Sequence, residues 1–423
     1  MSPTDDPQRI LLALFHAALA AADPARQVAA HLPPRPAKGR TVVVGAGKAA
    51  AAMAATVEAQ WDGPLSGLVI CPYGHGVETT RIRVVEAGHP VPDSAGFRAA
   101  TELLASLDGL TEDDLVLALI SGGGSALMAL PAPGLSLEDK RQVTQGLLMS
   151  GAPIGEVNCV RKHLSAIKGG RLAAAAYPAR VHALIVSDVP GDDLQTIASG
   201  PTVADSSTAA QALEIIRRYR LEIPFAVIQF LRKSTWETPK PDDPRLARST
   251  TSIITRPADA LAAAGDAARA LGITPVLLGD AIEGEAREVA RVMAGMALSA
   301  ARIGQPAAGP CVLISGGETT VTVRGRGRGG RNGEFALALA IALDGRHGIS
   351  AIACDTDGID GASEAAGAII LPDTLARAAA LGLDARACLD KNDSSGVFGP
   401  LGDLVVTGPT RTNVNDFRAI YIP

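Results

Sequence analysis

Short runs of apolar residues, each followed by an alanine-rich stretch, recur along the whole chain. The runs consist mainly of Val, Leu and Ile without polar alternation, which is typical of strands covered on both faces. The clearest occupy residues 41–45, 67–71, 115–120, 182–187, 275–279, 311–315, 350–354 and 403–408. Helices are predicted over 47–60, 94–107, 136–150, 161–177, 207–220, 256–271, 284–302 and 333–344. Strands that alternate with such helices predict an α/β fold with parallel sheets and right-handed crossovers.

The chain is long enough for more than one domain, since it has 423 residues and domains average roughly 100–200. Between Lys233 and Thr251 the sequence STWETPKPDDPRLARST is polar, proline-rich and without period, as in a linker. We therefore predict an N-terminal domain over residues 1–240 and a C-terminal domain over 241–423.

Charge and cysteine content restrict the partners of the protein. The formal net charge is −5, which provides no general attraction to nucleic acid or to an anionic membrane. The five cysteines are widely separated and form no C-x-x-C pair, so we expect reduced thiols and a cytoplasmic location. The apolar stretch 10–22 follows Asp5 and Asp6, whereas a secretory signal begins with positive charge. We interpret it as a helix capped by one of these aspartates.

In open α/β sheets, ligands bind beyond the carboxyl ends of the strands. The first such segment contains Gly45, Gly47 and Ala50 at the spacing of a dinucleotide-binding turn. That turn also requires an acidic residue at the end of the next strand, but the sequence there, 70–72, is Ile-Cys-Pro. This counts against NAD. Lys48 places a positive charge where a phosphate or carboxylate would rest, although it could also be a solvated lysine at a helix start.

The second segment is the turn Ser121-Gly122-Gly123-Gly124-Ser125. Its glycines let the backbone approach an anion closely, and its serines add two hydroxyl donors. It lacks the G-K-[ST] ending of a Walker A loop, and Leu127 replaces the last glycine of a nucleophile elbow. We interpret it as a phosphate or carboxylate site. A tight strand-to-helix turn is the structural alternative.

The third segment follows the strand 182–187 and contains Asp188, Asp192 and Asp193. Such oxygens suit Mg²⁺, which uses few protein ligands and keeps several waters. We favour Asp188 as the metal or phosphate-side residue, while helix capping competes for Asp192 and Asp193.

The fourth segment begins with Gly316, Gly317 and Glu318 and continues into the alternating Arg/Gly run 324–331. An RNA-binding function is unfavourable, because the run has no aromatic residue to stack bases and the chain is acidic. We interpret the run as a mobile cationic flap that closes over phosphates, with Arg331 nearest its structured end.

The fifth segment, 354–361, resembles a calcium loop but has Asp360 at the position that requires glycine. A carboxylate directly after a buried strand can accept a proton or hold a metal. We favour Asp357 for this role, with Asp355 and Asp360 as alternatives that brace the turn.

Basic residues also occur between Arg161 and Arg171. On a continuous helix, Arg161, Ser165 and Lys168 would share one face, for which plain solvation is the usual fate. His163 is expected to be structural, because no neighbouring residue offers an orienting carboxylate.

Taken together, these segments resemble the class II glycerate kinases, or glycerate 2-kinases, whose C-terminal part is called the MOFRL domain. The resemblance runs from about Val42 to Ile422. The matching stretches are VVVGAGKAA, GHPVPD, LALISGGGSALM, NCVRKHLSAIKGGRLA, SDVPGDDLQTIASGPT, LISGGETTV, GRGGRNGEFALA, DTDGIDG and TGPTRTNVND. The resemblance implies a Rossmann-like N-terminal domain and a smaller C-terminal α/β domain around a cleft.

It also implies Mg²⁺-dependent transfer of the ATP γ-phosphoryl group to D-glycerate, giving 2-phospho-D-glycerate. The family's functional lysine, arginine and aspartate fall on Lys48, Arg331 and Asp357. For substrate and ATP binding we add Gly45, Gly47, Ser121, Gly122, Gly123, Gly124, Ser125, Asp192, Glu318 and Asn332, with Asp188 for the metal. The implied partners are glycerate and ATP, without nucleic acid or membrane, and a homodimer is compatible. NAD(P)H-dependent hydroxypyruvate reductase is the alternative function, because some relatives carry that name.

Overall fold

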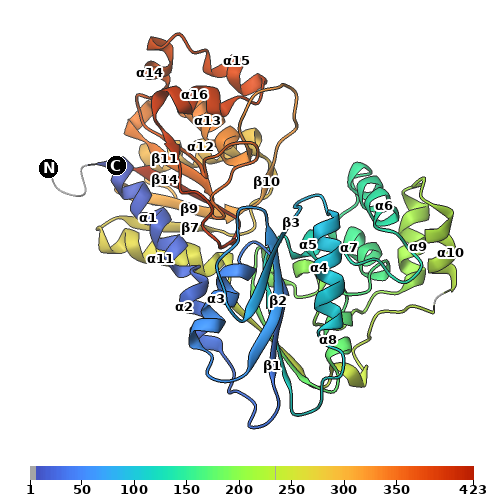
Figure 1. Cartoon of the computed structure of the whole chain (residues 1–423). Helices are drawn as coiled ribbons and strands as arrows, with labels where there is room; N and C mark the ends of the chain where they lie inside the picture. Colours follow the sequence, from blue (N-terminus) through green and yellow to red (C-terminus); the bar gives the residue numbers. More distant parts are fainter. Residues whose placement is uncertain (1–5, 234) are drawn as a thin grey trace. The chain divides into compact units, whose positions relative to one another are not determined.

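The computed structural model describes residues 6–233 and 235–423 of the chain. The chain divides into two compact units. We call Pro24–Ile254 the first unit, and Thr255–Pro423 together with the residues up to Asp23 the second unit. In Figure 1 the blue helix α1 (Pro7–Ala21) accordingly lies with the orange and red elements of the second unit.

The first unit is built on a six-stranded sheet in the order β3-β2-β1-β4-β5-β6. The strands are β1 (Thr41–Ala46), β2 (Leu65–Pro72), β3 (Ile82–Ala87), β4 (Leu115–Ile120), β5 (Arg180–Val186) and β6 (Ser249–Thr255). The pairs from β3 through β5 are parallel. Strands β1 and β4 are buried along their whole length, which explains their unbroken apolar sequences. The strand order reverses between β1 and β4, which is where such sheets bind ligands.

Helices flank this sheet and form a second, smaller apolar core. They are α2 (Pro24–His31), α3 (Ala50–Gln60), α4 (Ser94–Ala105), α5 (Gly124–Leu127), α6 (Leu137–Met149), α7 (Ile154–His163), α8 (Arg171–Ala176), α9 (Ala209–Arg218) and α10 (Phe225–Lys233), with 3₁₀ turns η2 (Pro190–Asp192), η3 (Ile197–Ser199) and η4 (Pro244–Leu246). Residues of α6, α7, α9 and α10 form the smaller core, which includes Leu147, Val160, Leu213 and Val227. The helix predicted over 161–177 is interrupted, since Gly169 and Gly170 adopt φ values of +57° and +81°.

The second unit contains a mixed six-stranded sheet in the order β13-β12-β11-β14-β9-β7. Its strands are β7 (Thr274–Gly279), β9 (Cys311–Gly317), β11 (Ser350–Asp355), β12 (Gly367–Ile370), β13 (Leu404–Val405) and β14 (Asp416–Ile422), beside a separate pair β8 (Gly284–Glu285) and β10 (Thr319–Thr320). Among the described residues, β7 and β9 form the only parallel pair of this six-stranded sheet. The parallel orientation predicted for 350–354 and 403–408 is therefore wrong, because an apolar run reports burial on both faces and not strand direction.

The helices of the second unit are α1, α11 (Pro257–Ala270), α12 (Ala286–Ile303), α13 (Arg331–Leu343), α14 (Thr374–Ala380), α15 (Ala385–Asp390) and α16 (Ser394–Leu401), with the 3₁₀ turn η5 (Arg346–Gly348). Asp6 caps α1 by accepting from Gln8 N at 3.0 Å, while Asp5 lies outside the described residues. Phe15 of α1 packs against Phe417, with ring centroids 5.7 Å apart.

The two units differ from the division predicted at residue 240 in two places. The first sheet gains β6 from residues beyond that position, and α1 packs within the second unit. The reason is the buried apolar face of α1, which includes Ile10, Leu14 and Phe15. The predicted α/β fold class is confirmed. Within the described residues, no helix combines the length and the apolar character needed to cross a membrane.

Candidate functional site

The two glycine turns predicted to bind ligands lie side by side at the carboxyl ends of β1 and β4. Gly45 of β1 pairs with Leu119 of β4, so the turns that follow these strands meet. Lys48 N donates to Gly122 O at 2.8 Å, and Ala49 N donates to Ser121 Oγ at 3.0 Å. A Cβ on Gly47 would lie 2.1 Å from Ser121 Oγ, so only glycine permits this approach. The structure thus brings both turns to the point where the strand order reverses.

The second turn continues into a network of hydroxyl groups around Ser125. Its Oγ lies 2.9 Å from Ser199 Oγ, which in turn donates to Asn158 Oδ1 at 3.1 Å. Ser199 and Ala198 adopt positive φ values of 62° and 50°, which non-glycine residues rarely do. Lys168 Nζ donates to Ser125 O at 2.6 Å and to Ser125 Oγ at 3.2 Å. Ser199 and Lys168, which lie 74 and 43 residues further along the chain, therefore both contact Ser125.

Lys168 is buried, so the prediction that it is solvated is wrong. Its exposed fraction is 2%, and Ser165 is fully buried. The prediction assumed one continuous helix, but the chain leaves the helix at His163 and turns inward before α8. Burial, with nearby Lys140 and Arg161, lowers the pKa of Lys168 well below its ordinary value.

His163 has the structural role that the sequence predicted. Its ring nitrogens lie 2.8 Å from Cys159 O and 3.2 Å from Glu237 Oε2. Burial lowers the pKa of the imidazole. The carboxylate partner was missed because Glu237 lies 74 residues further along the chain.

The aspartates after β5 have different local roles. Asp193 accepts from Gln195 N at 3.1 Å and from Thr196 Oγ1 at 2.6 Å, so it closes a local turn before η3 and does not cap that helix. Asp192 lies in η2 with φ of 55°, and Asp188 lies two residues beyond the buried end of β5. Among the described residues, no three His, Cys, Asp or Glu side chains are grouped to hold a metal. The role of Asp188 as a metal ligand stays a prediction.

In the second unit, the side chain of Arg331 is held by three carboxylates. Its Nε lies 2.8 Å from Asp416 Oδ1, its Nη1 3.0 Å from Glu318 Oε1 and its Nη2 2.7 Å from Asp355 Oδ2. Burial alone would lower the pKa of this guanidinium, but the three carboxylates outweigh it and hold the pKa above its ordinary value. Asn332 Nδ2 also donates to Asp416, at 2.7 Å. The structure therefore joins the predicted residues Arg331, Asn332 and Glu318.

The three aspartates of the 354–361 segment also divide their roles. Asp360 accepts from Asn332 N at 3.0 Å and from Gly333 N at 2.7 Å, at the start of α13. Burial raises its pKa to about 6. Asp357 is buried and accepts from Ile359 N at 2.8 Å. Asp355 and Asp360 thus brace the turn, as the alternative interpretation expected.

The Arg/Gly run is anchored along its length, which contradicts its interpretation as a mobile flap. Arg324 N and Gly325 N donate to Asn392 Oδ1 at 2.7 and 3.0 Å, and Arg328 N donates to Asp393 Oδ1 at 2.9 Å. A Cβ on Gly325 would lie 2.3 Å from the carbonyl oxygen of Lys391. The glycines in the run permit this close backbone packing.

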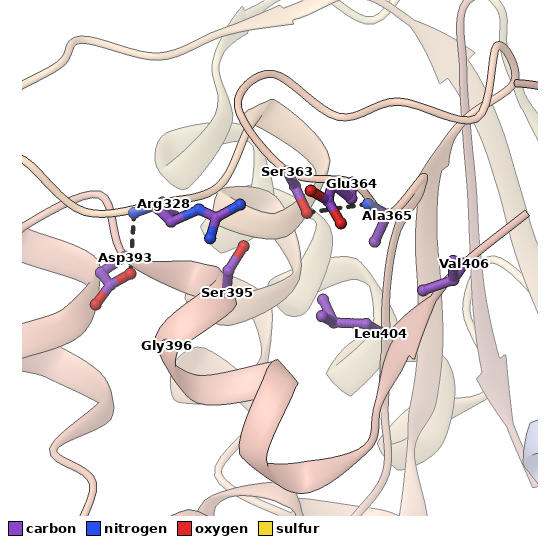
Figure 2. Close-up of a pocket in the computed structure, with 9 residues that line it drawn as sticks. All are labelled: Arg328, Ser363, Glu364, Ala365, Asp393, Ser395, Gly396, Leu404 and Val406. Carbon is purple, nitrogen blue, oxygen red and sulfur yellow. Dashed lines mark hydrogen bonds between the residues drawn. The ribbon is translucent and has the colours of Figure 1, made fainter. Parts of the chain in front are cut away.

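A pocket of about 410 Å³ lies beside the anchored run. Figure 2 shows the Arg328 side chain reaching along it toward Ser363 and Ser395, with Leu404 and Val406 at its apolar end. Apart from Arg328 of the Arg/Gly run, none of the residues predicted from the sequence to form the site is among those that line it. The pocket is therefore separate from the contacts of Arg331.

Comparisons with known proteins identify the family of the chain. The family described as "Domain of unknown function (DUF4147)" matches residues 10–232, and the MOFRL family matches residues 311–416. A D-glycerate 2-kinase of Thermotoga maritima is 41% identical, with 89% of each chain covered. The crystal structure of a glycerate kinase from Thermotoga maritima matches with a TM-score of 0.88 and 38% identity, covering 98% of this chain and 99% of the other. The chain belongs to the MOFRL-containing glycerate kinase family.

Another member of this glycerate kinase family has a different name. An Agrobacterium vitis protein, provisionally named a hydroxypyruvate reductase, is 55% identical over 98% of this chain and 94% of its own. The glycerate kinase relatives confirm, at the level of the family, the resemblance to class II glycerate kinases stated from the sequence.

Proposed function

We propose that the protein is a glycerate 2-kinase, which transfers the γ-phosphoryl group of ATP to the C2 hydroxyl of D-glycerate to give 2-phospho-D-glycerate and ADP. The observation that carries the proposal is the pair of glycine turns joined by the hydrogen bond from Lys48 N to Gly122 O. They present backbone N–H groups, two serine hydroxyls and a lysine at the point where the strand order reverses, a composition suited to phosphate and carboxylate oxygens. The glycerate 2-kinase relatives support the same activity.

The end of β2 argues against the reductase. A dinucleotide-binding sheet needs a carboxylate there to bind the ribose hydroxyls, but β2 ends in Cys71 and Pro72. Glu86 of the neighbouring strand β3 is engaged elsewhere, because it accepts from Gly74 N at 3.0 Å and Gly76 N at 2.9 Å. A kinase needs no carboxylate at the end of β2.

The catalytic roles follow from the chemistry of phosphoryl transfer, which depends on alignment and on neutralising charge. Lys48 and the turns around Gly45, Gly47 and Ser121–Ser125 would bind phosphate oxygens. Asp357 would accept the proton of the C2 hydroxyl while that oxygen bonds to the γ-phosphorus and the bond to the β,γ-bridging oxygen breaks. Arg331, held by Asp355 and Asp416, would present a fixed positive charge to the transferred group. We further propose that Asp192, Glu318 and Asn332 contribute to substrate binding.

We propose that Asp188, two residues beyond the end of β5, would hold Mg²⁺. Mg²⁺ is commonly held by one or two carboxylates together with nucleotide phosphates, so a single aspartate is chemically sufficient. When bound, the ion would neutralise phosphate charge. We also propose a cytoplasmic location, because all five cysteines are free thiols and four are buried.

The experiment is a pair of assays on the purified full chain. ADP formation is measured with ATP, D-glycerate and Mg²⁺, and the product is identified by phosphorus NMR, which separates C2 from C3 phosphorylation. In parallel, oxidation of NADH and NADPH is measured with hydroxypyruvate. Glycerate-dependent ADP formation with a C2 product supports the proposal. Hydroxypyruvate-dependent NAD(P)H oxidation without ADP formation overturns it.

A further inference from the structure

Three basic side chains in the first unit gather without an acidic partner. Lys140 and Lys168 are only 7% and 2% exposed, and Arg161 is half-buried. Within the described part of the chain, none of the three forms an ion pair. Lysine and arginine are almost never buried without a compensating charge, so this cluster calls for an explanation.

The loop between α7 and α8 brings the three cations together. Lys140 Nζ on α6 donates to Leu130 O at 3.2 Å, and Ser165 Oγ donates to the same carbonyl at 3.0 Å. Lys168 N donates to Ser165 Oγ at 3.4 Å. Arg161 lies in the last turn of α7, near enough to both lysines for its charge to lower their pKa values. The carbonyl of Leu130 and the hydroxyl of Ser165 therefore connect the elements that carry the cluster.

Neighbouring basic residues differ, because carboxylates lie near them. Asp205 pairs with Lys162 at 2.6 Å, and Asp205 and Glu237 oppose the effect of burial on the pKa of Arg171. Arg171 donates to Trp236 O at 2.8 Å and lies 5.2 Å above the indole ring. Burial, followed by the repulsion of Arg161 and Arg171, lowers the pKa of Lys140 to about 7. Lys140, Arg161 and Lys168 thus lack the nearby carboxylate that would favour their charged forms.

The cluster adjoins the candidate site through Ser125. Lys168 Nζ donates to both the carbonyl and the hydroxyl of Ser125, which follows the glycine turn at β4. Ser125 and Arg161 are half-buried, so a small ligand can reach them, while the two lysines lie behind. We propose that Arg161 and Ser125, backed by Lys140 and Lys168, form a subsite for an oxyanion, either the carboxylate of the acid substrate or a phosphate of the nucleotide.

This inference rests on the proposed function only for the identity of the ligand. An anion bound here would pair with basic side chains that have no acidic partner and little contact with water. Such pairing offsets the free-energy cost of burying a cation. The subsite would orient the acid or the nucleotide relative to the two glycine turns. Arg161, which sequence analysis assigned to solvent, would then be a binding residue.

The test measures binding without turnover. The full-length wild-type protein, Arg161→Gln and Lys168→Met are titrated by calorimetry with D-glycerate alone and with inorganic tripolyphosphate alone. Arg217→Gln is the matched control, because Arg217 is an exposed arginine of the same unit and its loss changes the net charge equally. We expect Arg161→Gln to weaken one ligand roughly 10-fold to 100-fold, as for loss of a charge-assisted hydrogen bond. The control should bind both ligands as the wild type does.

Each outcome decides the proposal. Selective loss of D-glycerate binding identifies the substrate carboxylate, and selective loss of tripolyphosphate binding identifies a nucleotide phosphate. The proposal is overturned if Arg161→Gln binds both ligands like the control, or if the wild type binds neither. If Lys168→Met does not fold, the Arg161→Gln variant still tests the proposal, because Arg161 is only half-buried. If the wild type binds an oxyanion through Arg161 but does not phosphorylate glycerate, the proposed function fails and this subsite stands.

A melting experiment separates binding from a purely structural role of Lys168. Replacing an unbalanced buried cation by methionine should leave the melting temperature of the ligand-free protein equal or higher, and should abolish its rise on addition of the ligand. A fall in melting temperature with an unchanged response to ligand would show that Lys168 only supports the carbonyl of Ser125 and would remove it from the subsite.

Discussion

Arg331 Nε donates to Asp416 Oδ1 at 2.8 Å, although the two residues are 85 positions apart. The same carboxylate accepts from Arg418 Nη2 at 2.5 Å, and Arg418 is fully buried. Asp416 therefore pairs with two arginines. Arg331 carries the candidate catalytic charge, and Arg418 lies inside the second unit. This arrangement makes the first residue of β14 a support for the site and for the fold.

Asp416→Asn should destabilise the second unit by roughly 3–5 kcal/mol, because it leaves the buried guanidinium of Arg418 without its charge partner. Urea unfolding monitored by circular dichroism measures the change. Glu288→Gln is the control, since Glu288 forms an exposed pair with Arg291 and its loss should cost less than about 1 kcal/mol. Equal, small effects of both substitutions would contradict the supporting role of Asp416.

Packing of the Arg/Gly run predicts a second effect. Gly325→Ala should destabilise the protein by roughly 1–3 kcal/mol, because the new Cβ would meet the backbone carbonyl of Lys391 at 2.3 Å. The matched control is Gly295→Ala on α12, where nothing lies within 4 Å of the new Cβ and alanine favours the helix by about 0.5–1 kcal/mol. Calorimetric melting should therefore move in opposite directions for the two variants. A free, mobile run would tolerate both.

The elements that could be predicted from the sequence are those whose signal is local. Strands β1 and β4 are buried along their whole length, so their apolar runs identified them, and the turns that follow carry their glycines in sequence. Strand β14 escaped prediction because its sequence contains Arg418, whose charge is balanced by Asp416 only in the folded unit. The sequence of β14 also does not indicate that the strand pairs antiparallel with β9 and β11.

Contacts across long sequence separations explain the rest of the differences. The partner of His163 is Glu237, and the partner of Lys168 is Ser125, 43 residues earlier in the chain. A helical projection placed Lys168 in solvent because it assumed that the helix continues through Gly169. The residue types of the site could be predicted from the sequence. Which charged side chains pair with one another could be seen only in the folded structure.

Asp360 predicts a dependence of stability on pH. Its folded pKa of about 6 lies above the ordinary 3.8, so between these values the folded state binds more protons than the unfolded state. Stability from this group is complete below about pH 3.8 and is lost as the pH rises through 6. The total is on the order of 3 kcal/mol at most.

The measurement compares the wild type with Asp360→Asn, which removes the titration. Unfolding free energies are determined from pH 4 to pH 7, and the stability of the wild type relative to the variant should fall across this range. Since all other groups are common to both proteins, their titrations cancel in the difference. A difference that is constant with pH would show that Asp360 has an ordinary pKa.

Lys48 provides the most direct test of the proposed phosphate site. Lys48→Ala should lower kcat for glycerate-dependent ADP formation by roughly 100-fold to 1,000-fold, because it removes a preorganised charge that neutralises the transferred phosphoryl group. Folding should be unaffected, since Lys48 N and its contact with Gly122 O belong to the backbone and are kept. Lys38→Ala, an exposed lysine of the same unit, is the control and should keep wild-type kcat. Near-normal turnover by Lys48→Ala, with a melting temperature equal to that of the wild type, would mean that the turn binds its ligand through backbone N–H groups alone and that the lysine has no part in transfer.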